Sequence, residues 1–205
     1  MKDQAGNVDD VVLGYDDFKS YQTLDAYIGA LVGRVANRIK KGTFELNGQT
    51  YHLPINNGPN SLHGGIKGFS YQVFDYQVLD ETSVEFHYVS KDGEEGYPGE
   101  LDFKADYSLE GDTLTMHYHA TTSKDTLINI TNHSYFNLSG KKENVYQHLL
   151  KVHADRFACR QYGAVKFAVL NKIDDCHGKC GERVCSHSTV SYTHLRAHET
   201  GRNLV

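Results

Sequence analysis

Strict alternation of apolar and polar residues marks the middle of the chain and predicts antiparallel β-structure. Apolar residues occupy every second position from 101 to 109, and the alternation resumes at residue 114 after a polar turn. Successive side chains of a strand point to opposite faces of the sheet, so this pattern predicts a hairpin with one buried face. The apolar positions are Leu101, Phe103, Ala105, Tyr107 and Leu109, followed by Leu114, Met116, Tyr118 and Ala120.

Shorter strands are predicted on both sides of this hairpin. Asn47-Gly48 separates the apolar-rich segments 44–46 and 51–53, and both residues tolerate the positive φ angles of a tight hairpin turn. Convincing helical periodicity is absent between residues 11 and 153. Many short strands at close spacing indicate an all-β fold, an antiparallel β-sandwich or barrel, and not a βαβ fold. The other expected strands are 71–79, 84–89 and 127–130.

Composition and charge narrow the classes of partner. The chain has 205 residues, with 21 Lys and Arg against 26 Asp and Glu, for a net charge of −5. This balance argues against a nucleic acid or an anionic membrane held by bulk charge. No apolar stretch is long enough to span a membrane, and no signal peptide is recognisable at the N-terminus. We therefore expect a cytoplasmic protein with no nucleic-acid or membrane partner.

The alternation is lost after Phe157, and the character of the sequence changes. All four cysteines lie at or beyond position 159, and residues 190–200 (VSYTHLRAHET) resemble the translation of a transposon end used as a sequencing adapter. We expect a folded domain in 1–157 and a tail in 158–205 that is disordered or artefactual. A zinc site is disfavoured because the spacing lacks the usual C-x₂-C pair. The residues concerned are Cys176, Cys180, Cys185 and His187.

The candidate chemistry lies in loops rich in glycine and asparagine, where functional residues concentrate. Each histidine alone fits a surface hydrogen-bonding residue as well as a functional one. Together, two histidines, an arginine and an asparagine, without a metal motif or a phosphate loop, suggest a polar neutral ligand such as a sugar. No cofactor or metal is expected. The candidates are Asn37 and Arg38 in GALVGRVANRI (29–39), His63 in NNGPNSLHGG (56–65) and His133 in TNHSYFNL (131–138).

These three motifs, together with DGEEGYPG (92–99) and DDVVLGYDD (9–17), resemble the aldose 1-epimerase (galactose mutarotase) family in order and spacing. The resemblance runs from about residue 9 to residue 157. It implies the antiparallel supersandwich of galactose mutarotases, and residues 1–157 would be a partial domain of it. We expect the N-terminal half of this fold, incomplete at both ends.

The resemblance also implies an activity, the interconversion of the α and β anomers of free hexoses such as galactose and glucose. His133 would be the general acid at the ring oxygen, and His63 would hydrogen-bond near the same oxygen. Arg38 and Asn37 would bind and orient sugar hydroxyls. The small-molecule partner would be an aldohexose.

The family has two further acidic site residues, a sugar-binding Asp and a catalytic Glu, whose motifs have no match in this sequence. We therefore expect the chain to be essentially inactive. Half a sandwich would leave unpaired strand edges and a half-covered apolar face, so we also expect poor solubility. Two other functions stay open, a non-catalytic carbohydrate-binding β-sandwich and a zinc-binding interaction protein that uses the tail cysteines. A third, a hexose-6-phosphate 1-epimerase, would need basic residues for the phosphate. Those near the site motifs are Arg34, Lys40, Lys41 and Lys67.

Overall fold

The structure is a computed structural model that describes residues 5–23, 26–140, 145, 156–161 and 164–169. It contains two compact units, residues 1–141 and 142–205, which are described separately. Within the described residues, every pair of strands is antiparallel. The all-β class expected from the alternation is confirmed, since helices are few and short.

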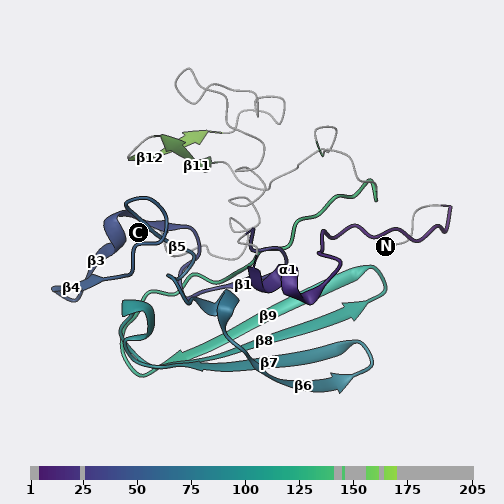
Figure 1. Cartoon of the computed structure of the whole chain (residues 1–205), viewed down its shortest axis with the longest axis horizontal. Helices are drawn as coiled ribbons and strands as arrows, with labels where there is room; N and C mark the ends of the chain where they lie inside the picture. Colours follow the sequence, from purple (N-terminus) through teal and green to yellow (C-terminus); the bar gives the residue numbers. More distant parts are fainter. Residues whose placement is uncertain (1–4, 24–25, 141–144, 146–155, 162–163, 170–205) are drawn as a thin grey trace. The chain divides into compact units, whose positions relative to one another are not determined.

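A four-stranded meander forms the main sheet of the first unit (Figure 1). Its strands lie in the order β6 (Asp75–Asp80), β7 (Ser83–Ser90), β8 (Leu101–Glu110) and β9 (Thr113–Thr122). Phe103 pairs with Ala120 and Tyr107 pairs with Met116, so the predicted hairpin forms and its apolar positions share one face.

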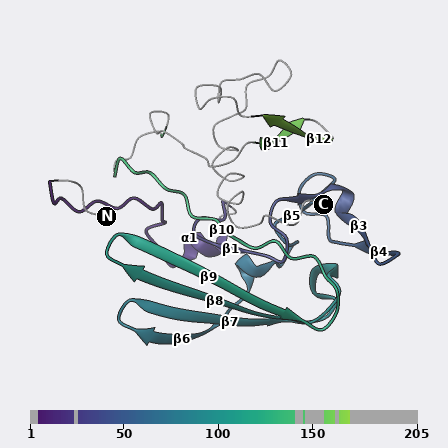
Figure 2. The ribbon, with the colours of Figure 1, turned by 180° about the vertical axis from the view of Figure 1, so that it is seen from behind.

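One face of this sheet carries the hydrophobic core. Leu101, Phe103 and Ala105 are at most 1% exposed and pack with Phe69. Burial of each large side chain stabilises the fold by about 1.5–3 kcal/mol. Partly buried residues outside the sheet, including Leu31, pack against this cluster, so the first unit covers the apolar face of the sheet. The segments around β1 lie on that side in both views (Figure 2).

The opposite face of the sheet is polar, as the alternation predicts. Lys104 Nζ lies 2.9 Å from a Glu85 carboxylate oxygen, and His87 Nε2 lies 2.8 Å from an Asp102 carboxylate oxygen. Surface ion pairs of this kind contribute little to stability, at most about 1 kcal/mol each. Among the described residues, no group of three His, Cys, Asp or Glu side chains could hold a metal ion.

Three short strand pairs build the remainder of the first unit. The predicted Asn47-Gly48 turn is confirmed, with φ angles of 52° and 76°. The pairs are β1 (Leu31–Val32) with β10 (Thr131–Asn132), β2 (Arg38–Ile39) with β5 (Ser61–Leu62), and β3 (Thr43–Leu46) with β4 (Gln49–His52).

The helical elements of the described residues are short, and only one is an α-helix. Helix α1 (Phe18–Thr23) has no buried residue, so it carries no apolar periodicity that a sequence pattern could show. Asp17 directly precedes the helix, and its carboxylate accepts the Ser20 amide at 2.9 Å and caps the helix. The 3₁₀ turns are η1 (Lys40–Gly42), η2 (Phe69–Tyr71) and η3 (Glu94–Gly96).

Two predicted strands need correction. The strand expected over 71–79 begins only at Asp75, because η2 occupies residues 69–71. The strand expected over 127–130 is absent, and Asn129 makes a single parallel bridge to Val35. The bridge does not extend because the backbone of Asn37, two residues further on, turns into the left-handed region with φ 67°.

The second unit contains one described hairpin. β11 (Arg156–Gln161) pairs with β12 (Ala164–Val169), so strand structure continues through the predicted boundary between residues 157 and 158. The zinc candidates of the tail and residues 190–200 lie outside the described residues. In the described part of the chain, no helix is long and apolar enough to cross a membrane.

Candidate functional site

Two histidines from distant loops lie side by side in the first unit. His63 directly follows β5 and His133 directly follows β10, and their ring centroids are 5.2 Å apart at 84°. Backbone hydrogen bonds fix both positions: the His63 amide donates to the Asn37 carbonyl at 3.0 Å, and the His133 amide donates to the Ala30 carbonyl at 2.8 Å. Both side chains are largely buried, with exposed fractions of 9% and 7%.

The contact with Asn37 sets the tautomer of His63. The Asn37 backbone amide donates to Nδ1 of His63 at 3.0 Å. Nδ1 is therefore an acceptor, and the neutral ring carries its proton on Nε2. Both residues have left-handed backbone, with φ angles of 67° for Asn37 and 54° for His63, a region in which Asn and His are enriched among non-glycine residues. The chain thus presents His63 as a hydrogen-bond donor through Nε2.

Arg38 lies beside this pair because β2 and β5 are neighbours. Its Nε donates to the Asn57 side-chain oxygen at 2.8 Å, and its Nη1 donates to the Asn37 side-chain oxygen at 3.3 Å. Arg38 and Asn37 are both exposed, so a cation and an amide lie at the surface beside the buried imidazole of His63, which Asn37 contacts. The structure therefore brings together all four residues singled out in the sequence.

Burial determines the charge state of His133. Desolvation lowers the pKa of this imidazole from its ordinary value, because the charged form loses hydration when it is buried. The ring is therefore neutral near pH 7. Its protonated form is a stronger acid than a free imidazolium, though less populated.

Besides Tyr135, whose ring centroid lies 5.0 Å from that of His133, the pattern of strands and motifs missed a residue that contacts both imidazoles, Tyr27. Its ring centroid lies 4.7 Å from that of His63 and 5.6 Å from that of His133, so it contacts both imidazoles. Its backbone is left-handed, with φ 55°. The only sequence signal is its place two residues before the first glycine of the 29–39 motif, in a segment without strand periodicity.

Arg34, by contrast, is a structural residue and no ligand for a phosphate. It is 2% exposed, and all three guanidinium nitrogens donate to protein oxygens. The acceptors are Ser90 Oγ at 2.9 Å, the Pro98 carbonyl at 3.0 Å, and the Ser90 and Lys91 carbonyls, both at 2.9 Å. The suggestion that Arg34 supports a hexose-6-phosphate site is therefore wrong.

Comparison with known proteins places these features in a family. The family model described as Aldose 1-epimerase matches residues 1–172. A galactose mutarotase of Bos taurus is 53% identical over 158 residues, which are 77% of this chain and 46% of that protein. An aldose 1-epimerase of Escherichia coli K12 is 37% identical over 169 residues, 82% of this chain and 49% of that protein. The chain spans about half the length of the curated relatives it matches.

Solved structures agree with the sequence comparison. A GalM/aldose epimerase homologue from C. elegans has a TM-score of 0.74 and 34% identity, with 80% of this chain and 52% of that chain covered. A galactose 1-epimerase from Lactobacillus acidophilus has a TM-score of 0.66 and 26% identity, with coverage of 80% and 50%. The strand pattern left an antiparallel sandwich or barrel open, and the sandwich that the family resemblance implies is thus confirmed. Fold, motifs and the match over residues 1–172 together show that this chain belongs to the aldose 1-epimerase family.

Proposed function

We propose that this chain contributes the two histidines of a mutarotase active site, together with Arg38 and Asn37. The site acts on free hexoses such as galactose and glucose. The observation that supports the proposal most directly is the pair His63 and His133, 5.2 Å apart, with Asn37 in contact with His63 and Arg38 in contact with Asn37. The names of the relatives, galactose mutarotase and aldose 1-epimerase, agree with this reaction.

The reaction needs an acid and a base on the two oxygens at the anomeric carbon. A base takes the proton of the anomeric hydroxyl, the bond from C1 to the ring oxygen breaks, and an acid protonates that oxygen. The open aldehyde rotates about C1–C2, and the reverse transfers close the ring on its other face. Because each step only moves protons and one electron pair, no oxidant or reductant is required.

The residues divide these tasks by their chemistry. His133 is the general acid that protonates the ring oxygen, and His63 donates a hydrogen bond near the same oxygen through Nε2. Arg38 and Asn37 bind and orient the sugar hydroxyls, since a guanidinium supplies donors only and an amide supplies both donors and acceptors.

The site is tested by titrating the histidine-labelled chain with galactose and following the imidazole NMR signals. We expect the His63 and His133 signals to shift together and to saturate at one Kd. Galactitol, which has neither a ring oxygen nor an anomeric hydroxyl, is the matched control and should shift them far less. No saturable change with galactose would overturn the sugar site, and preference for galactose 6-phosphate would favour the phosphate-specific alternative.

We further propose that the chain alone is essentially inactive, because no motif in its sequence matches the catalytic Glu that the family resemblance implies. One acid–base partner contributes about 10²–10⁴-fold to the rate. Polarimetry on freshly dissolved α-galactose is expected to show no acceleration above the spontaneous rate. A clear acceleration that increases with protein concentration would contradict the inactivity while supporting the mutarotase assignment.

Three expectations from the sequence stay proposals. The first is a family domain in 1–157 followed by a foreign tail in 158–205, which sequencing of the source DNA beyond the codon for Phe157 would test. The second is a cytoplasmic location, which fractionation of the source cells would test. The third is poor solubility of the isolated chain, which the soluble share after expression measures directly.

A further inference from the structure

The loop Asp92–Gly99 (DGEEGYPG) lies next to the histidine loop, which is the segment 63–68 that begins with His63. None of the residues in Asp92–Gly99 has a role in the site described above. We propose that this loop is a clasp that positions His63, with Glu95 as the positioning residue. The clasp itself is argued from contacts within the chain. Its effect on sugar binding rests on the proposed function.

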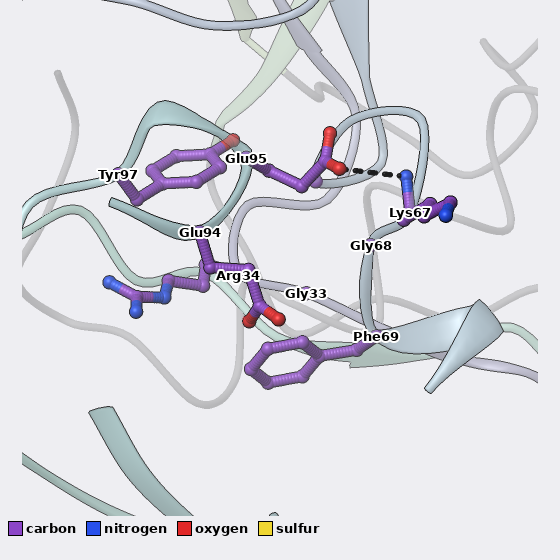
Figure 3. A pocket seen from close by; sticks show the side chains of 9 residues that line it. Gly33, Arg34, Lys67, Gly68, Phe69, Glu94, Glu95 and Tyr97 are labelled. Atoms are coloured by element: carbon purple, nitrogen blue, oxygen red, sulfur yellow. Dashed lines mark hydrogen bonds between the residues drawn. The ribbon is translucent and has the colours of Figure 1, made fainter. Parts of the chain in front are cut away.

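The Glu95 carboxylate accepts hydrogen bonds from the backbone shortly after His63. One carboxylate oxygen accepts the Ile66 amide at 2.7 Å. The other accepts the Lys67 amide at 3.0 Å (Figure 3). Hydrogen bonds to an ionised acceptor are about twice as strong as neutral ones. Ile66 and Lys67 are exposed, so packing contributes little to holding these two residues in place. The Glu95 carboxylate therefore fixes the position of their backbone.

Two consecutive glycines let the histidine loop fit against the clasp. A Cβ on Gly65 would lie 2.1 Å from a Glu95 carboxylate oxygen. A Cβ on Gly64 would lie 1.7 Å from the Gly33 carbonyl oxygen on the other side. The segment after His63 therefore runs between Glu95 and the backbone that leads into Arg34. Its close approach to both explains the Gly-Gly of the NNGPNSLHGG motif.

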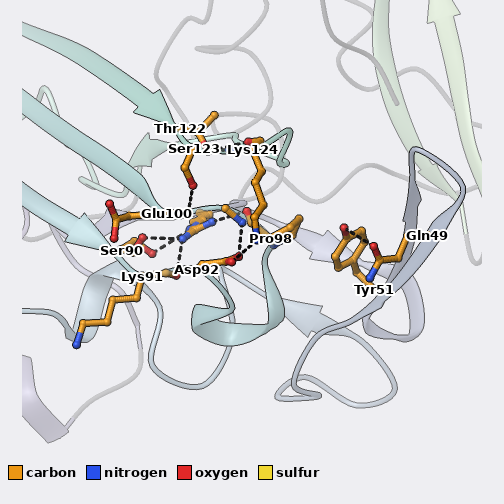
Figure 4. Close-up of polar contacts among 12 residues, drawn as sticks. Gln49, Tyr51, Ser90, Lys91, Asp92, Pro98, Glu100, Thr122, Ser123 and Lys124 are labelled. Carbon is orange, nitrogen blue, oxygen red and sulfur yellow. Dashed lines mark hydrogen bonds and ion pairs between the residues drawn. The ribbon is translucent and has the colours of Figure 1, made fainter.

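The loop that carries Glu95 is itself held at both ends. Asp92 accepts the Gly99 amide at 2.6 Å and pairs with Lys124, which closes the loop across its base (Figure 4). Inside the loop, Glu94 accepts the Tyr88 hydroxyl at 2.5 Å and also the Ser90 hydroxyl. These contacts hold the loop so that the backbone of Glu95 can keep its left-handed φ of 48°.

Arg34 joins the clasp to the other contact of His63. Its guanidinium donates to the Pro98 carbonyl within the loop and to the carbonyls of Ser90 and Lys91, which directly precede the loop. Three residues after Arg34 comes Asn37, whose amide donates to Nδ1 of His63. The clasp thus holds His63 from both directions, through the backbone that follows it and through the partner of its ring.

Glu95→Gln is the direct test, because it keeps the size of the side chain and removes the charge and one of the two acceptors. Glu81→Gln is the matched control, since Glu81 is exposed in the turn between β6 and β7. The full labelled chain is used for both. The readouts are amide exchange at Ile66 and Lys67, the ¹⁵N shifts that report the His63 tautomer, and the Kd for galactose.

In Glu95→Gln we expect exchange at Ile66 and Lys67 to accelerate about ten- to a hundredfold, with mixed tautomers at His63 and about tenfold weaker galactose binding. Glu81→Gln should change none of these. Unchanged exchange and unchanged His63 signals in Glu95→Gln would overturn the clasp.

A second variant separates positioning from general stability. Glu95→Asp keeps the charge but is one methylene shorter, and it should give an intermediate effect confined to the His63 loop. If exchange in β7 and β8 accelerates equally in both variants, Glu95 stabilises the whole unit and the positioning role is refuted. A chain that binds no galactose, yet shows the local loss in Glu95→Gln, would support the clasp and overturn the proposed function.

Discussion

Replacement of Arg34 by methionine is expected to lower the free energy of unfolding by about 3–5 kcal/mol. Methionine is unbranched and replaces the aliphatic stem of arginine, but it is shorter by the guanidinium group and donates no hydrogen bond. The buried carbonyl oxygens of Ser90, Lys91 and Pro98 then lose their guanidinium partner. The carboxylate of Glu94, whose charge favours the protonated guanidinium, loses a nearby cation as well.

The magnitude follows from the burial of this charge. A hydrogen bond to a charged group contributes about 1.5–3 kcal/mol, but the bonds made by Arg34 share one side chain and are not additive. Removing one partner of a buried ionic network costs about 3–5 kcal/mol, because the groups left behind stay desolvated. Arg34→Lys should recover only part of this loss, since an ammonium does not reproduce the planar fork of a guanidinium.

Urea unfolding of the soluble chain measures the effect. The chain has 14 tyrosines and no tryptophan, so tyrosine fluorescence and far-UV circular dichroism are the suitable probes. Lys40→Met is the matched control, because Lys40 is exposed in the turn η1 and its loss should change stability by less than about 0.5 kcal/mol. A loss below about 1 kcal/mol for Arg34→Met, with an unchanged m-value, would refute the reasoning from buried acceptors.

Three further predictions concern the core and the site. Phe103→Ala should cost about 3–5 kcal/mol by opening a cavity in the 1%-exposed core, while Leu109→Ala at a 49%-exposed position should cost less than about 1 kcal/mol; equal losses in urea unfolding would contradict the core assignment. Because the pKa of His133 is lowered in the folded state, the unfolded chain takes up the proton first as pH falls below about 6.5, and stability should fall there. This loss should be smaller in His133→Asn, and equal pH profiles would contradict it. Tyr27→Ala should weaken galactose binding about tenfold or more, since ring packing against both histidines is lost, while Tyr27→Phe should keep most of the affinity; calorimetry that finds both variants equal would refute the packing role.

The sequence predicted the central fold well because burial on a strand repeats every two residues. The alternation at 101–109 and from 114 onwards became the hairpin of β8 and β9, and Asn47-Gly48 became the expected turn. Leu109 and Leu114 belong to the apolar alternation but stay about half exposed, at 49% and 46%, because they pair next to the turn, at the end of the hairpin farthest from the buried Leu101. Alternation predicts which face a residue shares, and not how far the covering layer extends.

Short elements were predicted poorly because their causes are not periodic. Helix α1 has no buried residue and depends on the cap at Asp17. In the apolar segment 127–130, the described structure has one β-bridge, from Asn129 to Val35, and no strand. The candidate site was found only in part. Asn37, Arg38, His63 and His133 stood out as polar residues in glycine-rich loops, whereas Tyr27 sits in a segment without any pattern.

The sequence by itself determined the long hairpin of β8 and β9, its buried face and the Asn47-Gly48 turn, because each of these depends on neighbours within a few residues. Only the tertiary structure decided which loops contact one another and through which residues. Arg34 reaches Ser90 and Pro98 across 56 and 64 residues, and Glu95 reaches Ile66 across 29. Contacts between residues so far apart leave no periodic pattern in the sequence. Only the tertiary structure shows that Arg34 is structural and that the Glu95 carboxylate binds the loop of His63.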